Sequence, residues 1–408
     1  MGFTVEQECP QCGAPIDLDE TDHLLLCPYC EVRSFLFTSN YFRYILPNKA
    51  PERDIIYAPY LRFRGAVYFV KDLTIGHRIV DITNLGLESK AIPVSLGLRP
   101  QAMKMNFVTP ETKGSFLRFS LKAADIITRA GKLSTGNSGD KILHRAFIGE
   151  TMSIIYLPTY MEGDKLFDAV LNRPVSTIPN GMETLESDII KKPRWNISFI
   201  PTLCPQCGWN LDGDRDSVVM TCNNCDTAWE AVEGKFVRIK FLMVPRVDES
   251  SFYLPFWRIS ANTEGIKIDS FSDFIRITNQ PRVLGSEWEN VGMSFWSPAF
   301  KIRPKLFLNL ARQFTISQAL FNEEETIPGK NTYPVTLPRA EALQSLKIIL
   351  AVSTVNKKDV LPYLPSVRFG IKESALVYLP FRDTGHDLVQ EHTGISVNKR
   401  GLEFGRKL

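Results

Sequence analysis

The stretch CPQCGAPIDLDETDHLLLCPYC, at positions 9–30, has a second version later in the chain, CPQCGWNLDGDRDSVVMTCNNC, at positions 204–225. Each version holds two Cys-x-x-Cys pairs with 14 residues between them. Displacing the chain by 195 residues superposes the two versions, and aspartates and apolar residues between the cysteines coincide as well. This identical spacing predicts a duplicated structural element.

The eight cysteines of these stretches have the spacing of metal ligands. A Cys-x-x-Cys turn points two thiolates toward one point, and two such turns supply the four soft ligands of a tetrahedral zinc site. A site closed by four thiolates has no open coordination position, so two structural zinc ions are the expected cofactors. The predicted ligands are Cys9, Cys12, Cys27 and Cys30 for one ion, and Cys204, Cys207, Cys222 and Cys225 for the other.

Three other uses of the cysteines compete with zinc binding: disulfides, a redox pair and an iron site. Disulfides need an oxidising compartment, and a thioredoxin-like redox pair needs only one Cys-x-x-Cys in a βαβ setting. A rubredoxin-like iron site uses the same four ligands, and the sequence does not separate iron from zinc. Gly13 and Gly208 suit the positive φ that follows the second ligand. His23 lies opposite Val218 in the second version, so we expect a surface residue there rather than a ligand.

The segments that follow each cysteine-rich stretch also correspond. YFRYILP at 41–47 parallels FVRIKFLMVP at 236–245, and both alternate as strands do. A Tyr-x-Pro motif recurs four times, as IIYAPYLRF (55–63), IIYLPTY (154–160), SFYLPFWRI (251–259) and LVYLPFR (376–382). Because proline cannot donate to a sheet ladder, we expect these strands at a sheet edge or at a bulge.

The predicted fold class is α+β, with two duplicated halves. Each half is a four-cysteine zinc ribbon followed by a β-rich domain with one or two helices. Helix candidates are 116–132 and 338–353, the second with Pro338 in its first turn. The expected division is a first ribbon at 1–36, a β-rich domain at 37–175, a linker at 176–198, a second ribbon at 199–232 and a second β-rich domain at 233–408.

Bulk composition is that of an ordinary globular protein. The chain has 408 residues, 44% of them hydrophobic and 23% charged, with a net charge of +3. This small charge neither requires nor excludes a nucleic-acid partner. The start MGFTVEQECP lacks the features of a secretory signal, and the apolar runs fall short of the roughly 20 residues that a bilayer requires. We expect a cytoplasmic protein with no membrane span.

Two stretches resemble reactive sites without meeting their requirements. GKLSTGNSGDK at 131–141 fails the spacing of a phosphate loop, since Asn137 follows Gly136, and a surface loop is expected. HDLVQEH at 386–392 holds two histidines and two acids, and its i, i+6 spacing places the histidines on different faces of a helix but on the same face of a strand. No nucleophile elbow, dinucleotide motif or HExxH occurs. The sequence therefore predicts a protein that is not an enzyme.

Two functions of different classes remain. In the first, the protein is a protein-interaction, scaffold or assembly module, with Tyr-x-Pro edge strands and ribbons as docking elements. In the second, it binds nucleic acid in transcription, replication or repair, because arginines interleave with aromatics in YFRY (41–44), YLRFR (60–64) and FWR (256–258). The competing interpretation is core packing of the motif aromatics: Tyr57, Tyr156, Tyr253, Tyr378, Phe256 and Trp257. The partner and the oligomeric state are not fixed by the sequence.

At CPQCG, CPYC and CNNC the chain resembles the zinc-ribbon superfamily, which is widespread in transcription factors and helicases. Together with the FYLPFWRI strand, it resembles a set of bacterial proteins of unassigned function that carry tandem zinc ribbons. The resemblance implies metal ligation by the eight cysteines. It implies no catalytic or nucleic-acid-contacting residue.

Overall fold

The computed structural model describes residues 2–132, 142–178, 188–190, 195, 197–282, 285–329 and 331–406. The chain forms two compact units. Unit 1 comprises Met1–Arg64, Val80–Gly136 and Glu150–Thr202, and unit 2 comprises Gly65–Ile79, Asn137–Gly149 and Leu203–Leu408. Both units are strand-rich and the fold is mixed α+β, as the sequence predicted. The five-part division expected from the sequence stays a prediction.

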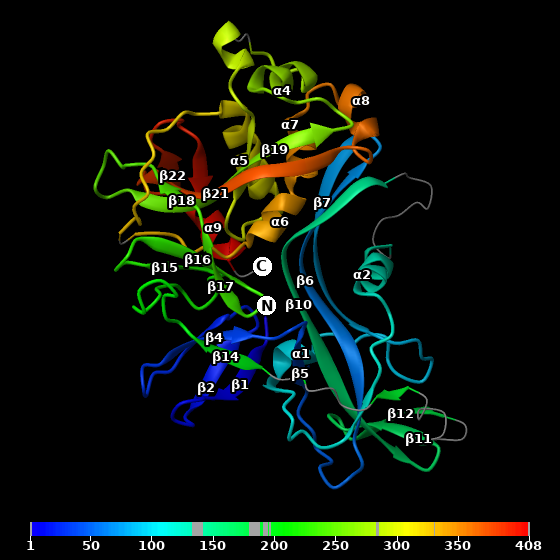
Figure 1. The fold of residues 1–408 in the computed structure, drawn as a ribbon. Helices are drawn as coiled ribbons and strands as arrows, with labels where there is room; N and C mark the ends of the chain where they lie inside the picture. The colour runs from blue at the N-terminus through cyan, green and yellow to red at the C-terminus, as the bar shows by residue number, and fades with distance from the viewer. Residues whose placement is uncertain are drawn as a thin grey trace. The chain divides into compact units, whose positions relative to one another are not determined.

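The first cysteine stretch folds as two short hairpins in unit 1. Their strands are β1 (Thr4–Glu8), β2 (Pro15–Asp19), β3 (Leu24–Leu26) and β4 (Arg33–Phe37). Strand β1 pairs antiparallel with β2, and β3 pairs antiparallel with β4. A Cys-x-x-Cys turn, called a knuckle below, joins the strands of each pair. We call residues 4–37 ribbon 1 (Figure 1).

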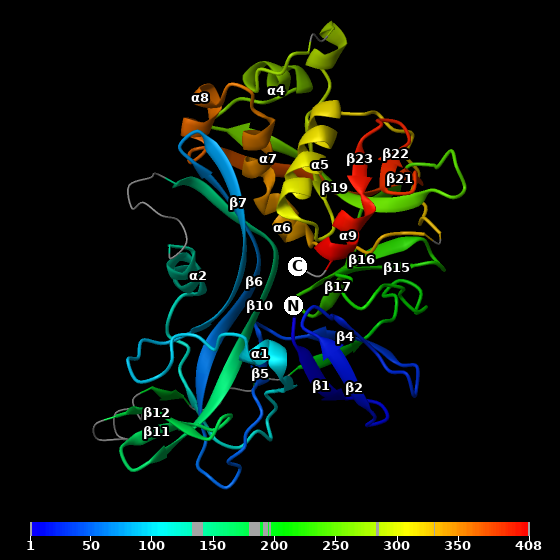
Figure 2. The ribbon, with the colours of Figure 1, turned by 180° about the vertical axis from the view of Figure 1, so that it is seen from behind.

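The rest of unit 1 is built on a curved sheet with the order β13-β9-β6-β10-β5-β8-β1-β2, in which β7 also pairs with β6. Residues 65–79, which span the end of β6 and the start of β7, and residues 142–149 of β10 belong to unit 2. The long strands β6, β7 and β10 are its main feature in both views (Figure 1, Figure 2). The elements are β5 (Phe42–Ile45), β6 (Ile56–Lys71), β7 (Thr74–Leu85), α1 (Arg99–Ala102), β8 (Lys104–Phe107), β9 (Ser115–Leu117), α2 (Ala123–Lys132), β10 (Ile142–Glu162), β11 (Lys165–Asp168), β12 (Arg173–Thr177), β13 (Ile189–Ile190) and β14 (Ser198–Pro201).

Unit 2 holds the second cysteine stretch and a separate sheet with the order β20-β19-β21-β22-β23. We call residues 203–239 ribbon 2. The elements are β15 (Val219–Cys222), β16 (Thr227–Val232), β17 (Lys235–Ile239), β18 (Phe241–Met243), β19 (Phe252–Glu264), α4 (Phe271–Ile277), η1 (Ser286–Glu289), β20 (Ser294–Pro298), α5 (Pro304–Ser317), α6 (Arg339–Gln344), α7 (Leu346–Ser353), α8 (Lys357–Val360), η2 (Leu361–Tyr363), β21 (Arg368–Asp383), β22 (Asp387–Gln390), β23 (Ser396–Asn398) and α9 (Lys399–Gly405).

Helices α5 and α7 cover a face of the β19–β21 sheet and close the core of unit 2 (Figure 2). Phe256 of β19 lies at its centre, with its ring 4.6 Å from that of Phe314 in α5. Burial of such aromatic side chains is the main stabilising term for a core of this kind. The helix predicted at 338–353 is confirmed as α6 and α7, preceded by Pro338 and interrupted at Ser345.

The Tyr-x-Pro strands do not lie at sheet edges, so the edge expectation was wrong. The expected bulge occurs in the pairing of β19 with β21, where the register shifts between Ser260 and Ala261. Strand β6 lies between β9 and β10, and β19 lies between β20 and β21. The motif aromatics are core residues instead, since Tyr57, Tyr156, Tyr253, Tyr378, Phe256 and Trp257 are all buried. The core-packing interpretation of these residues is therefore confirmed.

Central strands tolerate Pro158 and Pro380 because each of these prolines lies where one neighbouring strand ends and another begins. Strand β5 pairs with β10 as far as Tyr156, and β11 pairs from Thr159, so Pro158 falls in the junction. At such a point no strand carbonyl faces the backbone nitrogen of the residue, so the missing N–H of proline leaves no ladder hydrogen bond unmade. Each proline carbonyl accepts one backbone N–H. The bonds run from Gly86 to Pro59 (2.8 Å), from Ala169 to Pro158 (2.9 Å), from Ala299 to Pro255 (3.1 Å) and from Glu391 to Pro380 (3.3 Å).

Strand pairing repeats between the halves and suggests duplication beyond the cysteines. Strand β5 lies parallel to β10 with Ile45 opposite Tyr156, and β18 lies parallel to β21 with Met243 opposite Tyr378. A hairpin then extends each of these strands, β11–β12 on β10 and β22–β23 on β21. The two halves share these local arrangements of strands.

Two elements expected from the sequence have different bounds in the structure. The helix expected at 116–132 begins only at Ala123, because Ser115–Leu117 forms strand β9 beside β6. The strand expected at 236–245 is two strands, β17 and β18. The loop predicted at 131–141 lies outside the described residues from position 133 onward.

Candidate metal centres

The knuckles of both ribbons are formed by the same backbone bonds. The N–H of Gly13 donates to the carbonyl of Cys9, and the N–H of Gly208 donates to that of Cys204, both at 2.9 Å. Gly13 has φ of 73° and Gly208 has φ of 74°, so the positive φ expected there is confirmed. Only glycine adopts this conformation without strain.

Each ribbon brings its four thiol groups together. In ribbon 1 the sulfurs of Cys9 and Cys30 lie 3.7 Å apart, as do those of Cys12 and Cys27. In ribbon 2 the corresponding sulfur distances are 3.6 Å for Cys204 and Cys225 and 3.5 Å for Cys207 and Cys222. Within each group all four sulfurs lie within 4.8 Å of one another.

These distances fit a tetrahedral metal ion. Four sulfurs each ~2.3 Å from one ion would lie about 3.8 Å apart in a regular tetrahedron. A disulfide needs a sulfur–sulfur distance of about 2 Å, and all eight cysteines are free. Each group could therefore hold one metal ion, and its chemistry suits a thiophilic cation such as zinc.

The thiol groups cannot all ionise at this spacing without a cation. Burial raises the pKa of Cys27, but backbone N–H donors and neighbouring thiols lower it to about 6. Although the backbone N–H of Val32 lowers the pKa of Cys30, burial and the other thiols raise it to about 12. In ribbon 2, burial raises the pKa of Cys204, but backbone N–H donors and neighbouring side chains lower it to about 6. Although Thr227 lowers the pKa of Cys225, burial and the other thiols raise it to about 12. A divalent cation would offset the mutual repulsion of four thiolates.

Comparison of the chain with known protein families, with curated proteins and with solved structures found no match. The two four-cysteine groups are nevertheless consistent with zinc-ribbon-like sites. In the described part of the chain they are also the two places where three or more Cys, His, Asp or Glu side chains could share one ion.

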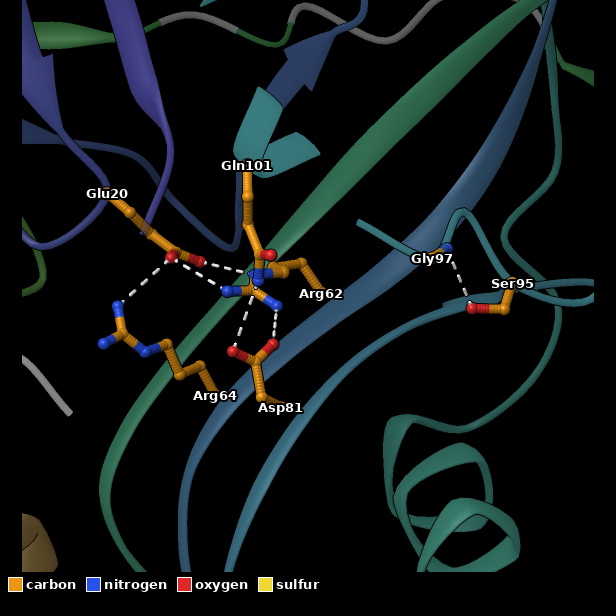
Figure 3. A network of polar contacts seen from close by, with 7 residues as sticks. All are labelled: Glu20, Arg62, Arg64, Asp81, Ser95, Gly97 and Gln101. Carbon is orange, nitrogen blue, oxygen red and sulfur yellow. Dashed lines mark hydrogen bonds and ion pairs between the residues drawn. The ribbon is translucent and has the colours of Figure 1, made fainter. Parts of the chain in front are cut away.

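A buried ion network holds ribbon 1 on the sheet of unit 1 (Figure 3). Glu20 follows β2, and its carboxylate accepts from Arg62 of β6, with an Nε–Oε1 distance of 2.8 Å. Arg62 also pairs with Asp81 of β7, and Arg64 lies 3.6 Å from Glu20. The side chains of Arg62 and Glu20 are 2% and 1% exposed, so the charges depend on one another for solvation.

The arginines of the basic-aromatic motifs are occupied within the protein. Arg62 and Arg64 belong to the buried network, and Arg258 pairs with Glu323 and lies over the ring of Trp296. Arg43 stacks on Trp195, 4.6 Å from the ring centre. These guanidinium groups neutralise carboxylates or pack on rings.

The third strand of each ribbon comes from a different part of the chain. In ribbon 2, β16 pairs with β17, which follows it directly. In ribbon 1, β4 pairs with β14, with Phe199 opposite Leu36. Under the 195-residue displacement, β14 takes the place on ribbon 1 that β17 takes on ribbon 2. This pairing was not predicted from the sequence, because β14 begins in the expected linker at 176–198.

That expected linker makes two further contacts in unit 1. Strand β13 pairs antiparallel with β9, with Ile189 opposite Leu117. Trp195 stacks on Tyr156, with ring centres 5.7 Å apart, and meets Phe116 edge-on at 5.1 Å. The segment between the halves is therefore held to unit 1 at three described points.

Ribbon 2 adds side-chain hydrogen bonds to its thiols, which the sequence analysis also missed. The Thr227 hydroxyl oxygen lies 3.2 Å from the sulfur of Cys225 and accepts from the indole N–H of Trp229 at 2.9 Å. The signal was present in the alignment, because Val32 stands opposite Thr227.

The histidines stay outside both thiol groups. His23 stacks on Phe35 with ring centres 5.9 Å apart, as expected of a ribbon surface residue. His386 and His392 flank strand β22, and His392 packs edge-on against Phe321. No helix of the described residues is long and apolar enough to cross a lipid bilayer.

Proposed function

We propose that this protein binds two structural zinc ions and works as a protein-interaction module with no catalysis of its own. The observation that carries the proposal is the pair of matched four-thiol groups at tetrahedral spacing. A structural zinc site contributes on the order of 10–16 kcal/mol of apparent folding free energy in small peptides. Hairpins of three to six residues per strand bury too little apolar surface to hold their shape alone.

Ribbon 2 offers the surface that such a module needs. Its strand order is β15-β16-β17, so in the described residues β17 pairs on one side only. Arg238 of β17 donates to Gln206 at 3.0 Å, which places this strand beside the first knuckle. Four large apolar side chains of ribbon 2 are exposed: Leu203 (49%), Trp209 (60%), Val232 (39%) and Val237 (45%).

A partner protein fits this surface better than nucleic acid does. An open strand edge accepts an extended peptide by main-chain hydrogen bonds, and an exposed tryptophan is a frequent centre of binding energy in protein interfaces. Nucleic-acid binding would require free basic side chains near aromatic ones. The arginines of the three motifs that suggested it are paired with carboxylates or stacked on rings. The cytoplasm is the proposed compartment, because its reducing conditions keep the thiols available for metal.

Affinity capture with matched variants tests this proposal. Full-length protein is compared with a Trp209→Ala, Val237→Lys double variant, and with a control that replaces the 81%-exposed Leu320 by Ala. We expect specific partners to be lost with the double variant and kept with the control, with or without nuclease. Cross-linking mass spectrometry should place the partner on residues 203–239.

The nucleic-acid alternative has its own test. Binding to random single- and double-stranded oligonucleotides is measured across a salt series with the same three proteins. A steep loss of affinity with salt would favour the alternative, because phosphate contacts release counterions. Capture that nuclease abolishes, together with salt-dependent oligonucleotide binding, would contradict the proposed protein partner.

A further inference from the structure

The two thiol groups have matching backbones and different side-chain surroundings. Thr227 is fully buried, and its hydroxyl oxygen lies 3.2 Å from the sulfur of Cys225 and 3.7 Å from that of Cys204. The indole nitrogen of Trp229 lies 2.9 Å from the same oxygen. One hydroxyl group therefore joins a buried indole to two of the four thiols.

The direction of these hydrogen bonds follows from their chemistry. An indole N–H only donates, so Trp229 uses a lone pair of the Thr227 oxygen. A metal-bound thiolate carries no proton and only accepts. The hydroxyl hydrogen of Thr227 is therefore directed to sulfur. The second knuckle also holds a polar side chain, that of Asn224, between Cys222 and Cys225.

Ribbon 1 has different residues at both positions. Under the 195-residue displacement Val32 replaces Thr227 and Tyr29 replaces Asn224. The backbone is conserved, because Glu31 and Asp226, which precede Val32 and Thr227, have φ of 60° and 47°. A valine side chain cannot donate, and the Tyr29 side chain extends into solvent with an exposed fraction of 70%. The thiolates of ribbon 1 thus lack the side-chain hydroxyl that Thr227 supplies in ribbon 2.

A hydrogen bond to a thiolate withdraws charge from sulfur and holds the ligand in its metal-bound orientation. Thiolate charge is also what makes cysteine a nucleophile. From this difference we infer that ribbon 1 is the exchangeable, electrophile-sensitive metal centre and ribbon 2 the inert one. Thr227 is the positioning residue that protects ribbon 2. The inference rests on the proposed zinc binding.

Alkylation of zinc-loaded, full-length protein tests the inference. N-ethylmaleimide adds to a thiolate through a new sulfur–carbon bond, its neighbouring carbon takes a proton from water, and the metal loses that ligand. Labelling of each cysteine is followed by peptide mass spectrometry at one fixed pH, while a colorimetric chelator reports released zinc. We expect the four cysteines of ribbon 1 to react about tenfold faster, with one zinc released alongside them.

Three variants separate the hydrogen bond from the exposure of the cysteines. Thr227→Val should raise the labelling rate of ribbon 2 about tenfold, and Thr227→Ser, which keeps the hydroxyl, should restore it. Val32→Thr should slow labelling of ribbon 1 while ribbon 2 is unchanged. Circular dichroism confirms that each variant is folded.

Equal labelling of both ribbons in the wild-type protein would overturn the inference. So would a Thr227→Val protein that is folded and labels like wild type. If Thr227→Val does not fold, Val32→Thr decides, and an unchanged ribbon 1 rate would overturn the inference. A metal count made before labelling distinguishes these results from failure of the proposed function, which would show as protein without zinc.

Discussion

Ribbon 1 and ribbon 2 share their knuckles and their central hairpin, yet they are completed differently. The pairs β3–β4 and β15–β16 have the same register under the 195-residue displacement, with Leu24 opposite Phe35 and Val219 opposite Glu230. Ribbon 2 then continues into its own third strand, whereas ribbon 1 receives β14 from the segment before ribbon 2. Thr202 hydrogen-bonds the carbonyl of Arg33, 169 positions away.

Some parts of this duplicated chain keep their roles in both copies and others do not. Knuckles and hairpins repeat because neighbouring residues specify them. The third strand is not specified by neighbouring residues alone. In ribbon 1 it is β14, which comes from the chain between the halves. The metal centre of ribbon 1 therefore depends on the chain between the halves in a way that the centre of ribbon 2 does not.

Loss of a thiolate ligand should have the largest effect. Cys9→Ser should release the metal of ribbon 1 while ribbon 2 keeps its own, and Cys204→Ser should do the reverse, because each ion is held by ligands of one ribbon. Native mass spectrometry should find one ion per chain in either variant. Release of both ions by one substitution would contradict the independence of the two centres.

Arg62 and Arg258 give a second comparison, because they lie at corresponding positions in the first Tyr-x-Pro strand of each half. Arg62→Ala should destabilise unit 1 by about 3–5 kcal/mol, because it leaves Glu20 buried with only the more distant Arg64, at 3.6 Å, as a partner. Arg258→Ala should cost about 1 kcal/mol, because its ion pair with Glu323 is partly exposed, at 27% and 17%.

Denaturant unfolding of both variants measures this difference. Hydrogen exchange then locates it, with the Arg62→Ala effect expected in residues 2–20 and 56–85. Equal destabilisation by the two substitutions would mean that burial of the Glu20–Arg62 pair has no energetic consequence.

Strand β14, the third strand of ribbon 1, provides a third test. Phe199→Ala should loosen β14 and make the ribbon 1 metal easier to remove, at a cost of about 1–2 kcal/mol, since Phe199 packs partly buried against the core. Phe236→Ala in β17 is the matched change in ribbon 2. Competition with a zinc chelator should show each variant losing the metal of its own ribbon first. Unchanged chelator curves for Phe199→Ala would remove the argument that β14 supports ribbon 1.

The last test concerns pH and unit 2. Burial and the nearby charge of Lys347 lower the pKa of His144 from 6.5 to about 4. Between these values the unfolded chain binds the proton and the folded chain does not, so stability is complete above pH 6.5 and is lost as pH falls toward 4. His144→Gln should lessen this loss in denaturant titrations at several pH values. Parallel curves for the two proteins would show that folding does not change the pKa of His144.

Local features were predictable from the sequence and distant ones were not. Four cysteines at fixed spacing specify a knuckle pair, and Gly13 and Gly208 mark its turns, so spacing alone was enough to predict both thiol groups. The Tyr-x-Pro strands were recognised as strands but assigned to edges. A proline gives no sign of lying at a junction between two neighbours, as Pro158 does.

Contacts between segments far apart in the sequence were the hardest to predict. Nothing near Glu20 indicates that Arg62 and Asp81 will surround it, because that network forms only when ribbon and sheet come together. Strand β14 is four residues long and begins in a polar, proline-bearing stretch, which favours a linker. Thr227 could have been found, since the alignment of the two ribbons already sets it opposite Val32.

Metal analysis of freshly isolated protein, joined to a count of free thiols, is the decisive measurement for both centres. Plasma emission spectroscopy should find two zinc ions per chain, and thiol titration after chelation and unfolding should find all eight cysteines reduced. Far fewer than two ions, with the cysteines joined as disulfides, would contradict the assignment of both thiol groups as metal centres.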